Sequence, residues 1–221
     1  MAVALVLMGV GGCATYERYR PTFWPFPERK LTTYRTPAMR VDAIHEFAQR
    51  STGVDTPEQR KITDQLARQI QVEPDPLVRQ AIVSSIAEFQ TPMAEQVLEA
   101  GLSDENSSVR LTCCQALGRR AEPNSVPSLT SALRSDKSVD VRLAAADALG
   151  KIKSPEATKA LEIALDDRDP ALQYAGVQSL KAITGQDYGP DVQVWRQVVE
   201  GKNPPLPTPT IAERIRKMSP F

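Results

Sequence analysis

The sequence predicts an all-α fold in which antiparallel helix pairs stack into a solenoid. Two series of motifs predict it. A five-residue motif recurs at intervals of 31 or 32 residues, at 75–79, 106–110, 138–142 and 169–173. Prolines that suit helix starts recur at the same intervals, at Pro92, Pro123 and Pro155. Composition agrees, since only 5% of the residues are aromatic and 41% are hydrophobic. A fixed period of this length is typical of a repeat array, in which stacked units share one core.

Residues 1–13 have the character of an export signal. Residues 2–10 are uncharged and apolar, too short a run to span a bilayer but suited to the apolar part of a signal. Residues 10–13, Val-Gly-Gly-Cys, resemble a bacterial lipobox, which implies lipidation of Cys13. Ala14 follows it, and the resemblance then implies the outer membrane. No basic residue precedes the run, so the alternative is an apolar N-terminus on a cytoplasmic protein.

Residues 14–35 are rich in aromatic and basic side chains. Pro21, Pro25 and Pro27 exclude a helix across this stretch. One interpretation is an extended tether near a membrane interface, where aromatic rings and basic groups are favourable. The alternative is a segment that covers the apolar end of the first repeat, because terminal repeats need such a cover.

The repeat domain is expected over residues 36–201, beginning with a divergent repeat over 36–72. Thr36-Pro37 provides an N-cap followed by proline at the first helical position. Thr56 and Gln59 are spaced as a capping box for the second helix.

The regular repeats and a closing helix occupy residues 75–201. Each first helix is expected to begin after an N-cap of a favourable type, at Asp75, Asn106, Ser138 and Asp169. Gly118 and Gly150 lie where left-handed residues would end two of these helices. Trp195, in the closing helix, is expected to pack on the last repeat. A proline-rich linker (202–209) and a short amphipathic helix (210–221) complete the chain.

These motifs resemble HEAT-like repeats of the short bacterial type first named from phycobilin lyases. The resemblance is clear over residues 75–185 and weaker over 36–72. It implies a right-handed α-solenoid of about five stacked helix–turn–helix repeats. Because one fold hosts many functions, it does not identify the function.

Candidate catalytic and metal-binding residues are few. HEAT-like iron enzymes use several His-Glu pairs, whereas His45 is the only histidine here, and one imidazole with one carboxylate does not complete an iron site. Cys113 and Cys114 are adjacent rather than spaced as metal ligands. Their expected role is core packing, with a redox role as the less favoured alternative. We expect no cofactor and no enzymatic activity.

Arg79, Arg110 and Arg142 recur in register and should form a column along the array. One interpretation is a stripe that binds anions or carboxylates. The favoured alternative is a structural ladder to Asp104, Asp136 and Asp167, or to carbonyls at helix ends.

The expected function is therefore a non-enzymatic, membrane-anchored scaffold or adaptor that binds protein or peptide partners through the solenoid surface. The membrane is reached through the lipid on Cys13, on the periplasmic side. The alternative is a lyase-like accessory or a chaperone for a chromophore or ligand. Nucleic acid is not an expected partner, because 27 basic residues balance 27 acidic ones and such binding depends on neutralising phosphates.

Overall fold

The computed structural model describes residues 36–49 and 54–206. The chain divides into two compact units, Met1–Thr36 and Pro37–Phe221, and the helices described below belong to the second. The candidate signal with Cys13, the tether at 14–35, the end of the proline-rich linker and the helix expected at 210–221 lie outside the described residues.

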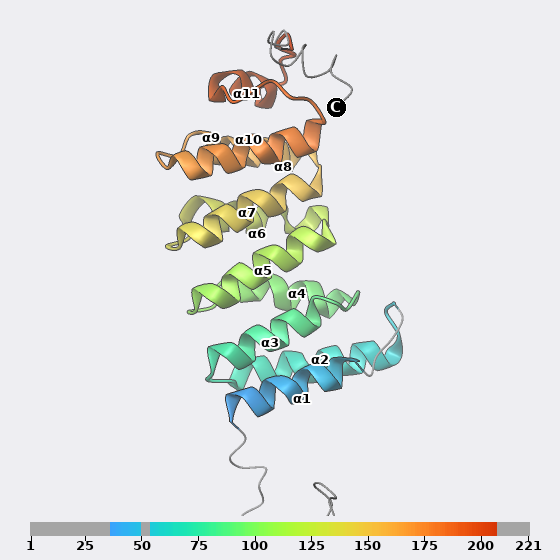
Figure 1. Ribbon diagram of the computed structural model, residues 1–221. Coiled ribbons are helices and arrows are strands. Elements are labelled where there is room, and N and C mark those ends of the chain that lie inside the picture. The colour runs from blue at the N-terminus through green and yellow to red at the C-terminus, as the bar shows by residue number, and fades with distance from the viewer. Residues whose placement is uncertain (1–35, 50–53, 207–221) are drawn as a thin grey trace, which may run out of the picture. The chain divides into compact units, whose positions relative to one another are not determined.

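Regular secondary structure in the described ranges is entirely helical (Figure 1). The elements are α1 (Pro37–Gln49), α2 (Pro57–Val72), α3 (Pro76–Ile86), α4 (Pro92–Gly101), α5 (Ser107–Arg120), a 3₁₀ turn η3 (Pro123–Ser125), α6 (Val126–Ser135), α7 (Val139–Ile152), α8 (Pro155–Ala160), α9 (Glu162–Leu165), α10 (Pro170–Thr184) and α11 (Val192–Val199). None of the described helices is long and apolar enough to cross a membrane.

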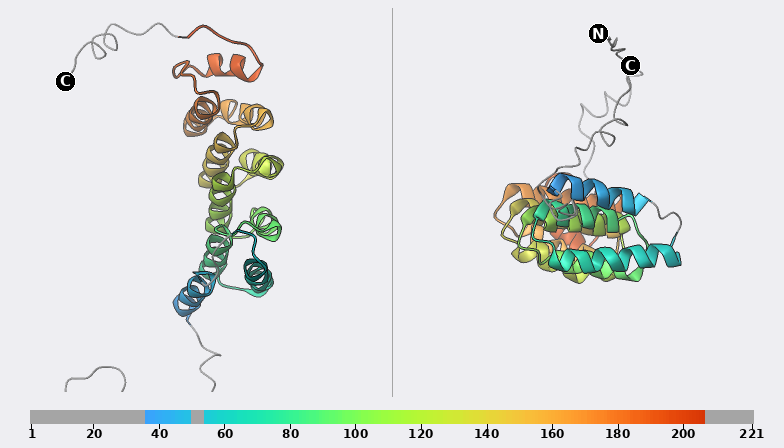
Figure 2. Two further views of the ribbon diagram at one scale, coloured as in Figure 1. Left: turned by 90° about the vertical axis from the view of Figure 1, so that its right-hand side faces the viewer. Right: turned by 90° about the horizontal axis from the view of Figure 1, so that it is seen from below.

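The helices of this unit form two layers (Figure 2). The first layer contains α1, α3, α5, α7 and α10, each packed on the next. The second contains α2, α4, α6, the α8–α9 pair and α11. Each first-layer helix and the second-layer helix that follows it form one repeat, which gives five. This confirms the predicted all-α solenoid.

The core lies between the two layers and runs along the stack. Its largest fully buried side chains include one or two leucines or isoleucines from almost every helix, among them Ile82, Leu98, Leu117, Leu133 and Leu149. Apolar residues at helical spacing place these side chains on one face of each helix. Since a single helix pair cannot enclose them, burial depends on the neighbouring repeats.

Two glycines bring neighbouring first-layer helices into close contact. A Cβ on Gly118 would lie 2.8 Å from Ala148 Cα, and one on Gly150 would lie 2.8 Å from Ser179 Cα. The expectation that these glycines adopt left-handed conformations is wrong, because both lie within helices. The left-handed residues are Ala121, with φ 54°, and Lys153, with φ 53°, which follow α5 and α7. Close packing of the helices therefore requires glycine at positions 118 and 150. The left-handed turn positions that follow these helices are occupied by residues with side chains.

The last repeat is closed by α11. Trp195 is fully buried, and its indole N–H donates to the Gly189 carbonyl at 2.7 Å. Its ring meets Tyr188 edge to face, with centroids 5.3 Å apart. Arg196 Nη2 bonds the Leu165 carbonyl and the Asp166 carboxylate. Together these contacts attach α11 to the end of the array.

We predict that Gly150→Ala destabilises the protein by about 1–3 kcal/mol, because the new methyl group overlaps the α10 backbone. Urea unfolding of the variant measures this. Helix propensity alone predicts the opposite, a gain of about 1 kcal/mol. Asp147→Ala, at an exposed position of the same helix, is the control and should change stability by no more than about 0.5 kcal/mol. A stabilised Gly150→Ala variant would contradict the close-contact explanation.

Candidate functional site

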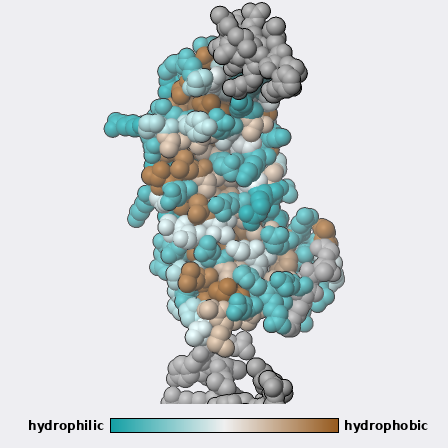
Figure 3. All heavy atoms as spheres, in the orientation of Figure 1, coloured by the Kyte–Doolittle hydropathy of each residue, from teal (hydrophilic) through white to brown (hydrophobic). Residues whose placement is uncertain are grey.

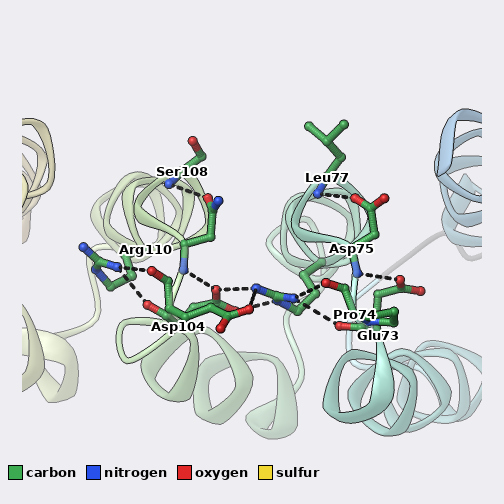
Figure 4. A network of polar contacts seen from close by, with 10 residues as sticks. Glu73, Pro74, Asp75, Leu77, Asp104, Ser108 and Arg110 are labelled. Atoms are coloured by element: carbon green, nitrogen blue, oxygen red, sulfur yellow. Dashed lines mark hydrogen bonds and ion pairs between the residues drawn. The ribbon is translucent and has the colours of Figure 1, made fainter.

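A ladder of arginines and carboxylates joins successive repeats. Arg79 lies in the first turn of α3, and its Nε and Nη2 each donate to the Asp104 carboxylate at 2.8 Å. Its Nη1 donates to the carbonyls of Glu73 and Pro74, in the loop before α3 (Figure 4). One guanidinium thus holds the loop before its own helix and the loop of the next repeat.

Arg110 repeats this arrangement one step along the stack. Its Nε and Nη2 donate to the Asp136 carboxylate at 2.7 and 2.8 Å. Its Nη1 donates to the carbonyls of Asp104, at 2.8 Å, and Glu105, at 3.2 Å. The two-pronged fit of guanidinium to carboxylate is the strong form of this contact. Both arginine forks are therefore filled by the protein's own carboxylates.

The ladder carboxylates also order the loops that contain them. Asp104 accepts from the Asn106 backbone N–H and Asp136 from the Ser138 backbone N–H, each at 2.8 Å. Burial alone would raise the pKa of Asp104, but the bonds from Arg79 and the Asn106 N–H lower it below its usual value. The pKa of Asp136 is likewise lowered against burial, by Arg110 and the Ser138 N–H.

Three of the four predicted N-cap side chains bond a backbone N–H of the helix that they precede. Asp75, Asn106 and Asp169 each accept from the backbone N–H two residues later. Ser138 also occupies the N-cap position that the sequence predicts, but its side chain makes no capping bond. Ser138 has the backbone angles of Asn106, φ −89° and ψ 125°. The difference therefore lies in the side chain, because Ser138 carries a hydroxyl where Asn106 carries an amide.

The first step of this ladder was not predicted from the sequence. Arg40 in α1 donates to both oxygens of the buried Glu73 carboxylate, at 2.6 and 2.7 Å. Arg40 lies three residues after Pro37, just as Arg79 lies three residues after Pro76. That spacing could have identified it.

The ladder is interrupted at Arg142. Its Nη1 donates to the Asp136 carbonyl at 2.9 Å, but its buried Nε has no partner among the described residues. The structure records no ion pair between Arg142 and Asp167, contrary to the in-register expectation. Gln173 takes the arginine position in the next helix and donates to the Asp167 carbonyl.

An open groove lies between the second-layer helices α4 and α6, with a volume of about 620 Å³. Unlike α2 and α4, or α6 and α8, these two neighbours make few direct contacts. The lining is mainly polar: Glu99, Leu102, Ser103, Asp104, Glu105, Arg110, Ser128, Ser131, Ala132, Ser135, Asp136 and Lys137. We call this the α4–α6 groove.

The first-layer face differs from the groove. Large exposed apolar side chains on it include Leu77, Val139 and Tyr174, from three different helices. Figure 3 shows separate apolar patches on this face, divided by polar and charged side chains. They form no continuous apolar strip in this view.

The other candidate residues do not form a reactive site. His45 is exposed on α1. Cys113 and Cys114 are fully buried free thiols, and burial, above all, raises both pKa values, that of Cys114 to about 12. A thiol with a raised pKa is a poor nucleophile at neutral pH. Within the described ranges, no three His, Cys, Asp or Glu side chains are grouped to hold a metal ion.

Comparison with known proteins agrees with this architecture. A family model of HEAT repeats matches residues 61–139 and 126–192. The chain belongs to the HEAT-repeat family. A search of curated proteins found no match.

Solved structures with a similar fold include two of different kinds. Human deoxyhypusine hydroxylase in complex with glycerol is 18% identical, with 68% of this chain covered and a TM-score of 0.53; this chain spans 65% of the length of that enzyme. The complex of CpcE and CpcF of phycocyanin lyase, from Nostoc sp. PCC7120, is 15% identical, with 80% of this chain and 73% of that chain covered and a TM-score of 0.50. At these identities the likeness shows a shared fold.

We predict that Arg110→Met destabilises the protein by about 3 kcal/mol, because it leaves the part-buried Asp136 carboxylate without its cation. Arg142→Met is the matched control, in the same register but without a carboxylate partner. It should cost about 1 kcal/mol or less. Urea unfolding compares the two, and equal losses would contradict the view that the carboxylate contacts stabilise the ladder.

The ladder also predicts how stability depends on pH. The pKa values of Asp104 and Asp136 are lowered in the folded protein, whereas in the unfolded chain an Asp titrates near about 3.9. Their contribution to the free energy of unfolding is therefore present above about pH 4. It is lost as the pH falls through their lower pKa values in the folded protein. The free energy of unfolding, measured from neutral to acidic pH, should fall less steeply for Asp136→Asn than for the natural protein. Asp147→Asn, at an exposed position outside the ladder, is the control to which the slope of Asp136→Asn is compared.

Proposed function

We propose that the protein is a non-enzymatic scaffold or adaptor that binds a protein or peptide partner on its helical surface while anchored to a membrane. The observation that carries the proposal is the α4–α6 groove. Its walls belong to the stacked repeats, and no described bond joins its serine hydroxyls or the Glu99 carboxylate to a neighbouring repeat.

The chemistry of the groove supports binding rather than catalysis. Asp104 and Asp136 are engaged by arginines, so they do not serve as a free acid and base. The remaining lining offers hydroxyls, two glutamates and a lysine, which suit hydrogen bonds to a peptide.

The lyase-like alternative receives less support from this groove. Pockets for small organic ligands are mostly apolar and enclose the ligand, whereas this groove is open and lined mainly by polar side chains. A peptide or an extended protein segment suits it better than a largely apolar chromophore.

The membrane anchor in this proposal is supported by the sequence of residues 1–13. An apolar run followed by small residues and Cys13 has the pattern of an exported and lipidated protein. An anchored binding module would restrict its partner to a membrane surface, on the periplasmic side. The alternative is a cytoplasmic scaffold with the same groove.

We test binding with a photo-crosslinking residue in place of Ser131, which lines the groove, and the same residue in place of Gln115, which is exposed on the first layer. In cells that make the full chain, we expect a discrete crosslinked product from position 131 and a weaker one or none from 115.

Mass spectrometry of the purified chain should show an N-terminal acylated Cys13 that is lost in Cys13→Ser. Equal products at both positions would contradict groove binding, and an intact Met1 without acyl chains would contradict the anchor.

A further inference from the structure

We propose that the α4–α6 groove takes an extended basic segment of the partner, with a Lys or Arg side chain held against the α4 wall. This inference rests on the proposed binding function and specifies the chemistry of the partner. It follows from the charges that the groove leaves unpaired, from a buried carboxylate oxygen beside it, and from the spacing of hydroxyls on α6.

The charge of the groove favours a cation. Four carboxylates and two cationic side chains line it. The ladder satisfies Asp104 and Asp136, which leaves Glu99, Glu105 and Lys137. Glu105 receives one bond, from Arg79 Nη2 at 3.1 Å, and its side chain is 83% exposed. The Glu99 carboxylate has no hydrogen bond or ion pair to any described residue, although the residue is only partly exposed. Glu99 is therefore the strongest unoccupied acceptor in the groove.

A second observation concerns Glu95, another carboxylate on α4. Glu95 lies four residues before Glu99 on α4, and such pairs share one helix face. Its Oε1 atom is buried and has no hydrogen-bond partner among the described residues. A buried carboxylate oxygen without a donor is costly. Glu95 is not among the residues that line the groove, so a Lys ammonium or Arg guanidinium held by Glu99 would supply the missing donor and a compensating charge once the Glu95 side chain turns toward the groove.

The opposite wall suits a peptide backbone. Ser128, Ser131 and Ser135 lie on one face of α6 and all line the groove. From Ser128 to Ser135 the helix rises about 10 Å at 1.5 Å per residue, which matches roughly three residues of an extended chain. Hydroxyls both donate and accept, so Ser128 and Ser131 can bond backbone N–H and C=O groups whatever the partner's sequence. The Ser135 hydroxyl donates to the Ser131 carbonyl and can still accept from a backbone N–H. The carboxylates of α4 then select basic side chains.

Fluorescence anisotropy tests the proposal with three labelled peptides of equal length, one basic, one acidic and one neutral. We expect the basic peptide to bind the full chain at least about tenfold more tightly than the other two, with affinity falling as salt is added. Glu99→Gln and Glu95→Gln should each weaken its binding severalfold, whereas Glu162→Gln, exposed on α9, should not. Glu95→Gln should not lower the unfolding midpoint, because it removes a charge that has no partner. A solely structural role for Glu95 would not give this combination.

The outcomes separate the basic-partner inference from the binding function. If the acidic or neutral peptide binds equally well, or if Glu99→Gln and Glu95→Gln bind the basic peptide unchanged, the basic partner is wrong, while crosslinking at position 131 would still support binding. If no peptide binds and position 131 gives no product, both proposals fail. If sedimentation shows self-association that Glu99→Gln abolishes, the occupant is a second copy of this chain and the proposal is overturned.

Discussion

The contact on which the array depends most is the arginine that spans two loops. Arg79 holds the carbonyls of Glu73 and Pro74 with one nitrogen and the Asp104 carboxylate with two others. Because the Asp104 carbonyl in turn accepts from Arg110, successive steps share the same loop residue. From α1 to α7 the ladder therefore fixes the position of each first-layer helix relative to the next, which the nonspecific apolar core does not do alone.

Much of the fold could be predicted because the repeats reuse the same local chemistry. The in-register arginines and the Asx N-caps were visible as spacings, and Asp104 and Asp136 were predicted as ladder partners. Two features that the sequence did not predict depend on the details of single side chains. Ser138 has the backbone angles of an Asn cap, but its hydroxyl makes no capping bond, and Gly118 packs closely against Ala148 rather than forming a left-handed turn. The contact of Gly118 depends on α7, which is a neighbour in space rather than in the sequence.

The candidate site was much less predictable than the fold. The α4–α6 groove is formed by residues from two separated stretches, 99–110 and 128–137, and none of its serines belongs to a motif. The groove exists because α4 and α6 make fewer direct contacts with each other than the neighbouring pairs of second-layer helices do. Sequence periodicity describes what repeats have in common, so it does not reveal a gap that arises where they differ.

The ladder and the groove are physically connected, since Asp104, Arg110 and Asp136 belong to both. The ladder uses their charges internally and holds the floor of the groove in place, so little rearrangement is needed when a partner binds, which favours affinity. Selectivity for the partner is then determined by side chains outside the ladder. Glu99 lines the groove, and Glu95 lies four residues before it on the same face of α4 with a buried carboxylate oxygen that has no donor among the described residues. The partner's chemistry is therefore set by residues that the repeat architecture leaves free, and carboxylates in such a position select a cation.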